Sequence, residues 1–185
     1  MPIHIANIDR HTLPDIVLPC RACCYWECPA QCTRGKHTEE EARLKAEWFE
    51  KTASQFDPCG KVLYVGDEPA AYCQYAPPQH LPGVSEYPQL APRVDRDGIF
   101  ISCLYVPSDH QRKGLGRRLL SEVIDELRNR GLKAVETFAR DDSANNCSGP
   151  TQFYLAQGFS VVATETYPDG ASFSLVRLDL GSSPR

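Results

Sequence analysis

The sequence has no hydrophobic run long enough for a membrane span, no excess of positive charge and no internal repeat. Apolar residues make up 42% of the 185 positions but never approach about 18 in succession, and the first residues lack the basic and apolar segments of a secretion signal. With 20 Lys and Arg against 24 Asp and Glu, the formal charge is -4, so bulk electrostatic binding to nucleic acid is not expected. We expect a cytoplasmic protein without membrane or nucleic-acid partners, built as a single domain over residues 1–185.

Cysteine, by contrast, is abundant: there are nine, and five of them lie between Cys20 and Cys32. Without a secretion signal, such crowding indicates a metal site, redox chemistry or small buried residues rather than a disulfide scaffold. The segment contains one Cys-x-x-Cys pair, Cys20 with Cys23, whereas strong zinc motifs contain two. Buried thiols are the favoured interpretation, a structural metal and a reversible disulfide stay open, and no residue is assigned as a metal ligand.

Apolar periodicity predicts a mixed series of strands and helices. The capping box from Thr38 to Glu41 opens one helix, and Gly131 ends another. Residues 13–36 and 77–97 are rich in proline and are expected to be irregular, and the second is long enough to suggest a functional or mobile segment. The expected strands are 3–8, 61–65, 70–76, 99–106, 134–139, 159–164 and 173–180, and the expected helices begin at 38, 115 and 150. Short links around the helix at 115 make its two neighbouring strands parallel, whereas the strand pairs before and after them are antiparallel.

The stretch between residues 104 and 118 carries the clearest chemical signal. Gly114 and Gly116 allow close backbone approach, and the helix that follows offers unpaired N–H groups at its start. Positive charge is added by Arg112, Lys113, Arg117 and Arg118. This combination suits an anion such as a pyrophosphate. It is neither a Walker loop, since Gly-x-x-x-x-Gly-Lys-Ser/Thr is absent, nor a dinucleotide fingerprint, since the third glycine would fall on Leu119.

Two motifs in this part of the chain resemble those of the GCN5-related N-acetyltransferase (GNAT) superfamily. Residues 111–116 (Gln-Arg-Lys-Gly-Leu-Gly) resemble its Gln/Arg-x-x-Gly-x-Gly/Ala acyl-CoA loop, and residues 153–159 (Phe-Tyr-Leu-Ala-Gln-Gly-Phe) resemble its Tyr-x-x-x-Gly-Phe segment. The order of elements agrees over about residues 59–180. The resemblance implies an α/β (α+β) fold, with a mixed, mostly antiparallel central sheet, one parallel strand-helix-strand unit and helices on both faces. It also implies an N-acetyltransferase that uses acetyl-CoA as cosubstrate.

The resemblance further implies roles for individual residues. The strand backbone at Leu104, Tyr105 and Val106 would pair with the pantetheine arm of acetyl-CoA. Tyr154 would protonate the departing thiolate, which suits a phenol because its reference pKa of about 10 keeps it protonated at neutral pH. The pyrophosphate would be held by Gln111, Arg112, Lys113, Gly114, Leu115, Gly116 and Arg117.

One position departs from the family pattern. Family members often carry an asparagine seven residues before the tyrosine, where this chain has Cys147, and Pro150 replaces a small residue at the helix start. Asn145 and Asn146 lie close by in the sequence and are candidates for the same contact with the pantetheine arm.

The acceptor side carries no motif. An attacking amine must be neutral, and deprotonating a lysine-like amine at pH 7 costs roughly 4 to 5 kcal/mol, so a carboxylate or a water chain usually assists. Glu136, on the strand beside the acyl-CoA strand, and Glu27, in the cysteine segment, are the main candidates, followed by Asp95 and Asp97. Glu136 on a half-exposed strand and Glu27 in a loop also fit ordinary solvated positions.

The acceptor itself stays open between the amine of a small molecule and that of a peptide. A homodimer is compatible with the resemblance, since dimers are common in the family. Two other functions also stay open: a catalytically silent acyl-CoA sensor, and a metal-binding interaction module built on residues 20–32.

Overall fold

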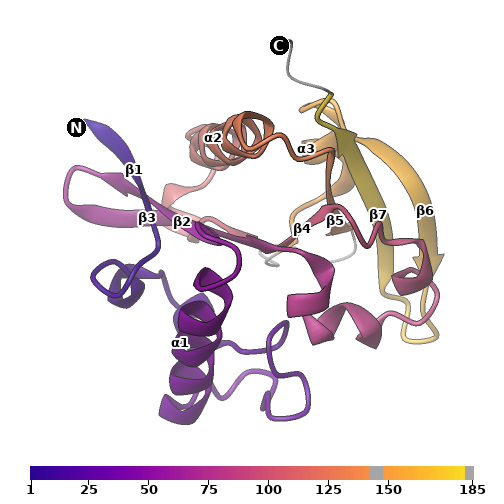
Figure 1. The fold of residues 1–185 in the computed structure, drawn as a ribbon, viewed down its shortest axis with the longest axis horizontal. Helices are drawn as coiled ribbons and strands as arrows, with labels where there is room; N and C mark the ends of the chain where they lie inside the picture. The colour runs from indigo at the N-terminus through magenta and orange to yellow at the C-terminus, as the bar shows by residue number, and fades with distance from the viewer. Residues whose placement is uncertain (142–147, 182–185) are drawn as a thin grey trace.

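The computed structural model describes residues 1–141 and 148–181, and its centre is a seven-stranded sheet in the order β1-β2-β3-β4-β5-β7-β6 (Figure 1). The pair β4–β5 is parallel and the other neighbours are antiparallel. The strands are β1 Ile3–Asn7, β2 Gly60–Val65, β3 Glu68–Ala76, β4 Ile99–Tyr105, β5 Ala134–Arg140, β6 Ser160–Thr166 and β7 Ser172–Asp179. The prediction of a mixed, mostly antiparallel sheet with one parallel unit is confirmed.

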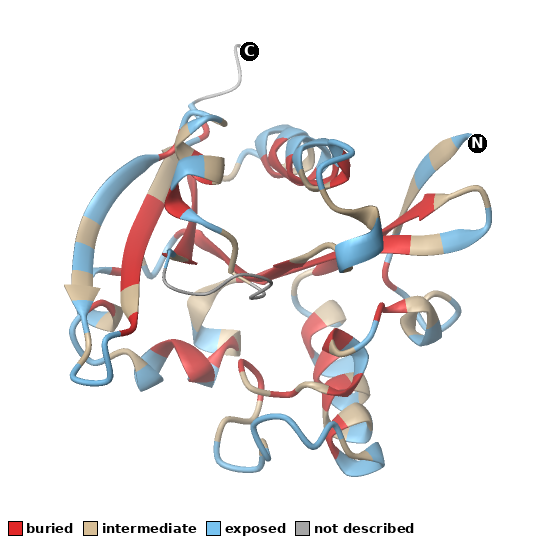
Figure 2. Cartoon of the chain, turned by 180° about the vertical axis from the view of Figure 1, so that it is seen from behind, coloured by how far each residue is buried: buried red, intermediate tan, exposed pale blue. Residues whose placement is uncertain are grey.

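Helices cover both faces of the sheet, as predicted: α1 (Glu39–Ala53) lies on one face, and α2 (Leu115–Asn129) and α3 (Thr151–Leu155) lie on the other (Figure 1). α2 buries one apolar stripe against the sheet, which is the arrangement that its 3.6-residue periodicity requires. That stripe consists of Leu115, Leu119, Leu120, Val123, Ile124 and Leu127. Buried residues line the central strands and the inward sides of the helices (Figure 2). No helix in the described part of the chain is long and apolar enough to cross a membrane.

The start of α1 is fixed by the predicted capping box. The Thr38 hydroxyl accepts a hydrogen bond from the Glu41 amide at 3.2 Å, and the Glu41 carboxylate accepts one from the Thr38 amide at 2.8 Å. Two backbone N–H groups that a helix start leaves unpaired are therefore satisfied reciprocally.

Replacing Thr38 by alanine is expected to lower the free energy of unfolding by about 1 kcal/mol, because the helix loses one side of its cap. Urea unfolding followed by circular dichroism measures this. Thr38→Ser keeps the hydroxyl and serves as the control; an equal loss in both variants would mean that the hydroxyl contributes nothing.

The two proline-rich segments contain short 3-10 helices rather than longer elements. Residues 13–36 contain Leu13–Asp15 and Cys20–Ala22, and the connection 77–97 contains three more. The connection packs closely on the cysteine segment: a Cβ on Gly83 would lie 2.7 Å from the Trp26 Cα. The long connection is therefore built into the α1 side of the molecule.

Element boundaries differ from the predicted ones by small amounts. β3 begins at Glu68 instead of residue 70, so that only Gly66 and Asp67 turn the hairpin, with Gly66 at a φ of +64°. Pro69 is tolerated there because β4 pairs with β3 only from Tyr72 onward, which leaves no ladder hydrogen bond for a proline to break on that side.

Candidate functional site

The parallel strands β4 and β5 stay together for a short distance only. Their register contains two pairs, Ile99 with Val135 and Phe100 with Glu136. β5 then follows β7 along its whole length, while β4 follows β3 with a register shift that places Ser102 as an extra residue. The strands of the sheet therefore diverge beyond Phe100. The Thr137 hydroxyl of β5 still donates to the Ile101 carbonyl at 2.8 Å, and the backbone of β4 from residue 102 onward is not paired with β5.

The loop after β4 leads straight into the start of α2. Gln111 is turned back toward the strand, and its side-chain amide donates to the Val106 carbonyl at 2.9 Å. Arg112 and Gly114 adopt left-handed conformations, with φ of +58° and +79°, and Gly114 is the N-cap of α2 without a side-chain cap hydrogen bond. The first amides of α2 therefore have no capping side chain among the described residues. This is the geometry of an anion site.

The predicted acyl-CoA residues thus lie together, from the end of β4 through the loop to the first turn of α2. Arg112, Lys113 and Arg117 are exposed beside the uncapped amides. Leu104 and Leu115 are buried apolar side chains, so that only their backbone is available to a ligand.

Tyr154, the predicted acid, lies on α3 in the same apolar cluster as α2. Its side chain is fully buried, and its hydroxyl donates to the Ser148 carbonyl at 2.7 Å. Burial raises the pKa of Tyr154 well above its ordinary value, so the phenol keeps its proton at neutral pH. The neighbouring Phe153 ring lies 3.8 Å from the position of a Cβ on Gly116, which places α3 beside the loop. Asn145, Asn146 and Cys147 lie outside the described residues.

Glu136 lies at the last position where β4 and β5 are paired, and its carboxylate contacts two other residues. Its Oε2 accepts from the Asp95 amide at 2.8 Å, and its Oε1 lies 3.5 Å from a guanidinium nitrogen of Arg177. Burial raises its pKa above the ordinary value. Asp97 joins this network through its amide, which donates to Asp95 at 3.0 Å. The structure does not bring Glu136 and Tyr154 together, because Glu136 shares the α1-facing side of β5 with Phe138, whereas Tyr154 packs on the α2 side.

The expectation that Glu136 lies on a half-exposed strand is wrong. β5 is buried from Ala134 to Ala139, since the sheet is covered on both faces at this point. Alternation of polar and apolar residues marks an exposed face only when nothing packs on it.

Glu27 belongs to a buried polar cluster between α1 and β3. Its Oε1 accepts from the Lys45 ammonium at 2.7 Å and from the Gln74 side-chain amide at 2.6 Å. Lys45 also donates to Gln74 at 2.8 Å, and the Tyr72 hydroxyl donates to the same Gln74 oxygen. The Glu27 Oε2 is buried and has no hydrogen-bond partner among the described residues. Since Gln74 pairs with Cys103 of β4, the Glu27 carboxylate lies beneath β3, the strand next to β4.

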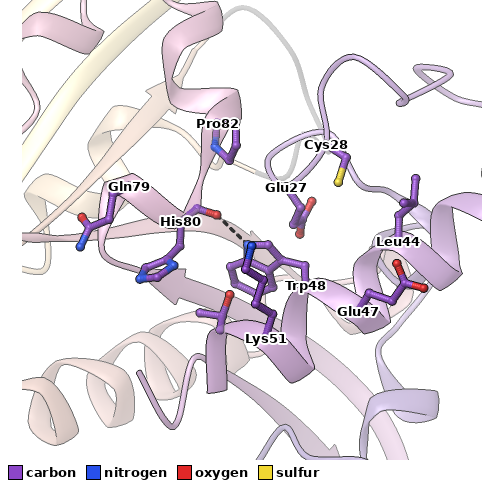
Figure 3. Close-up of a pocket in the computed structure, with 10 residues that line it drawn as sticks. Glu27, Cys28, Leu44, Glu47, Trp48, Lys51, Gln79, His80 and Pro82 are labelled. Carbon is purple, nitrogen blue, oxygen red and sulfur yellow. Dashed lines mark hydrogen bonds between the residues drawn. The ribbon is translucent and has the colours of Figure 1, made fainter. Parts of the chain in front are cut away.

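A cavity of about 300 Å³ adjoins Glu27 (Figure 3). Its walls come from α1, from the residues after β3 and from the cysteine segment, and the Trp48 indole closes one side by donating to the His80 carbonyl at 2.6 Å. The lining residues are Glu27, Cys28, Leu44, Glu47, Trp48, Lys51, Thr52, Gln79, His80 and Pro82. A carboxylate oxygen without a partner beside this cavity suits the cationic or N–H end of an amine.

Sequence reasoning missed the partners of Glu27. Lys45 lies three and four residues before Trp48 and Phe49, on the buried side of α1, and Gln74 interrupts the apolar run of β3. A charged residue on an apolar stripe and an amide inside a buried strand are the signals that would have indicated a buried polar cluster.

Comparisons with known proteins agree with this geometry. The model of the Acetyltransferase (GNAT) family matches residues 23–159. L-amino acid N-acyltransferase MnaT of Escherichia coli (strain K12) is 42% identical over 65 residues, which are 35% of this chain and 34% of that enzyme, so the match spans about a third of either protein.

Solved structures extend the similarity to the whole fold. The yncA protein of Salmonella typhimurium, solved with its cofactor acetyl-CoA, is 19% identical with a TM-score of 0.66, and the alignment covers 100% of this chain and 98% of that one. The paia N-acetyltransferase of Thermoplasma acidophilum, in complex with coenzyme A, is 12% identical with a TM-score of 0.63 over 97% of this chain and 99% of that one. At such identities the likeness establishes the fold.

Proposed function

Because the chain belongs to the Acetyltransferase (GNAT) family, we propose that it transfers an acetyl group from acetyl-CoA to an amine of a small molecule or a peptide. The observation that carries this proposal is the divergence of β4 from β5 directly before the uncapped start of α2. A strand backbone that its neighbour leaves uncovered can pair with the amides of a pantetheine arm, and an uncapped helix start can bind the pyrophosphate. Relatives of the same fold are solved with acetyl-CoA and coenzyme A, which supports the same cosubstrate here.

Acetyl-CoA, when bound, supplies an acetyl thioester activated toward nucleophiles. The backbone of Leu104, Tyr105 and Val106 orients the pantetheine arm, and the N–H groups of residues 111–116 bind the pyrophosphate. Arg112, Lys113 and Arg117 add charge at the same place. The Tyr154 hydroxyl keeps its proton at neutral pH and gives it to the departing sulfur in place of its hydrogen bond to the Ser148 carbonyl.

On the acceptor side, the two carboxylates have different roles in the proposal. Glu27 accepts a hydrogen bond from the acceptor nitrogen at its Oε2, which has no other partner among the residues described here. Glu136, whose raised pKa makes its carboxylate a better proton acceptor, receives the proton that the amine loses on direct attack in a ternary complex.

The direct test combines calorimetric titration with acetyl-CoA and a turnover screen against polyamines, aminoglycosides, amino acids and peptides with free N-termini. Binding together with acetylation of one class supports the proposal. Absence of acetyl-CoA binding overturns it. Binding without turnover of any acceptor would instead indicate a catalytically silent acyl-CoA sensor.

Tyr154→Phe is expected to lower kcat by about 100-fold with little change in the KM for acetyl-CoA, because only the proton donor is removed. Since burial raises the pKa of Tyr154, we also expect no loss of kcat from this residue below about pH 10 in the parent enzyme. Steady-state kinetics over a pH series measures both effects.

Tyr75→Phe is the matched control for this variant. Tyr75 is buried in the same apolar cluster, and its hydroxyl donates to Glu126 at 2.8 Å, so the same atom is removed from a comparable environment. We expect about 1 kcal/mol of lost stability in either variant but a change in kcat for Tyr154→Phe alone. Equal kinetics in the two variants would make Tyr154 a packing residue.

A further inference from the structure

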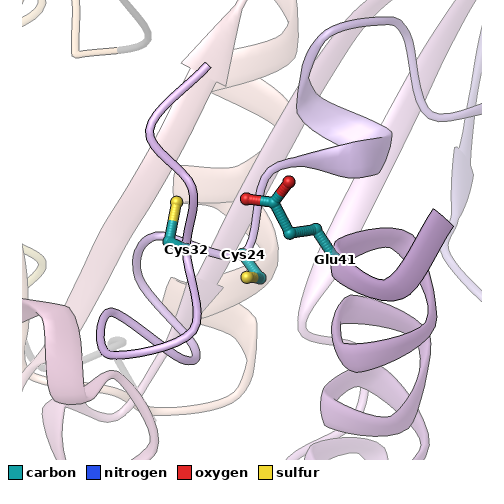
Figure 4. A group of neighbouring side chains, drawn as sticks. All are labelled: Cys24, Cys32 and Glu41. Atoms are coloured by element: carbon teal, nitrogen blue, oxygen red, sulfur yellow. The ribbon is translucent and has the colours of Figure 1, made fainter. Parts of the chain in front are cut away.

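The crowded cysteines bring two thiols next to a carboxylate, at a place that the acetyl-transfer proposal does not use. The Cys24 and Cys32 sulfurs and a carboxylate oxygen of Glu41 all lie within 4.8 Å of one another (Figure 4). Cys24 and Cys32 belong to the irregular segment before α1, whereas Glu41 belongs to the first turn of that helix. Cys24 and Glu41 are buried, and Cys32 is half-buried.

Local hydrogen bonds hold the three groups in this arrangement. The Cys28 amide donates to the Cys24 carbonyl at 2.7 Å and the Cys32 amide donates to the Cys28 carbonyl at 3.1 Å, so that two consecutive turns bring Cys32 back toward Cys24. Thr33 then anchors the segment on the helix, because its amide and its hydroxyl donate to the Glu41 carboxylate at 2.8 and 2.9 Å.

From this geometry we infer that Cys24, Cys32 and Glu41 form a binding site for a thiophilic divalent cation of the zinc type, which joins the cysteine segment to α1. Two sulfur donors exclude magnesium and calcium, which take oxygen ligands, and a mixed set of sulfur and oxygen suits zinc. A tetrahedral zinc ion holds such donors about 3.5 to 3.8 Å apart, so the three groups need to approach one another by about 1.3 Å at most. A water molecule completes the tetrahedron.

The hydrogen bonds of Glu41 are compatible with this role. The Oε1 oxygen accepts a hydrogen bond from the Thr33 amide, and a carboxylate oxygen has a second lone pair to offer a metal. Ligating carboxylates are themselves usually oriented by hydrogen bonds of this kind. The site would also fix the neighbouring Glu27, which lies between the two cysteines in the chain, beside the cavity.

The test is the metal content of the full-length protein purified under reducing conditions without chelator. We expect one zinc ion per chain in the parent protein, and a thiolate-to-metal charge-transfer band after exchange with cobalt. Cys32→Ser is expected to lower the zinc affinity at least about 10-fold and to remove most of the charge-transfer band. Cys28→Ser, a partly buried thiol of the same segment outside the group, is the matched control and should leave the metal in place.

Glu41→Gln removes the anionic ligand but keeps the cap of α1. Glutamine still accepts the Thr38 amide in a capping box, whereas its NH2 group faces the Thr33 amide, which loses its acceptor. We expect weaker zinc binding with unchanged circular dichroism. The inference is overturned if the reduced parent protein takes up no stoichiometric zinc on titration, or if Cys28→Ser and Cys32→Ser bind it equally. These measurements do not depend on acetyl transfer, so they test the metal site independently of the proposed function.

Discussion

Replacing Gly116 by aspartate is expected to weaken acetyl-CoA binding at least 100-fold, about 2.7 kcal/mol, without loss of stability. Gly116 is the second residue of α2, and a Cβ there would meet Val106 at 3.4 Å, which is an ordinary van der Waals contact. A carboxylate in the first turn stabilises a helix by about 0.3 to 1 kcal/mol. The same carboxylate repels the pyrophosphate that this helix start is proposed to bind, so the single change separates binding from folding.

Isothermal calorimetry and thermal denaturation measure the two effects of this substitution side by side. Ser121→Asp is the matched control, because it adds the same charge to an exposed position of α2 beyond the first turn and should bind acetyl-CoA like the parent. Gly116→Ala tests size alone and should weaken binding much less. If Gly116→Asp binds acetyl-CoA normally, the pyrophosphate lies elsewhere and the assignment of residues 111–117 is wrong.

The loop and helix start that are proposed to bind acetyl-CoA could be predicted from sequence as structural elements, because their determinants are local. A capping box spans four residues, the apolar stripe of α2 repeats within one helix, and the loop glycines are adjacent to the helix that they open. Local determinants of this kind depend on neighbours along the chain, which the sequence displays directly.

The acceptor half could not be predicted because it depends on contacts between distant segments. Lys45 reaches Glu27 and Gln74, which lie 18 residues before it and 29 residues after it. The divergence of β4 and β5 likewise needs the pairing of β5 with β7, a strand at the far end of the chain. A single sequence shows Glu27 and Lys45 as separate charges, and only the fold makes them a buried pair.

The buried ion pair of Glu27 and Lys45 is the basis of the largest expected change in stability. Lys45→Met should lower the free energy of unfolding by about 3 to 5 kcal/mol, because it leaves the buried carboxylate of Glu27 without its cation. Burial alone would lower the pKa of Lys45, but the Glu27 carboxylate raises it above its ordinary value. The stabilisation from a raised lysine pKa is complete below about pH 10 and is lost only above it, so the effect of the substitution should be constant between about pH 6 and 9.

Denaturant unfolding of three further variants identifies the cause of this loss. Arg43→Met removes two exposed ion pairs of the same helix, with Glu40 and Glu47, and should cost at most about 1 kcal/mol. Glu27→Gln combined with Lys45→Met removes both buried charges and should recover most of the stability; a double variant less stable than Lys45→Met alone would show that packing, not charge, is lost.

Glu27→Gln alone removes the anion beside the cavity. If Glu27 binds the acceptor, the stable double variant will have a raised KM for the amine with an unchanged KM for acetyl-CoA, because the loop at α2 is untouched.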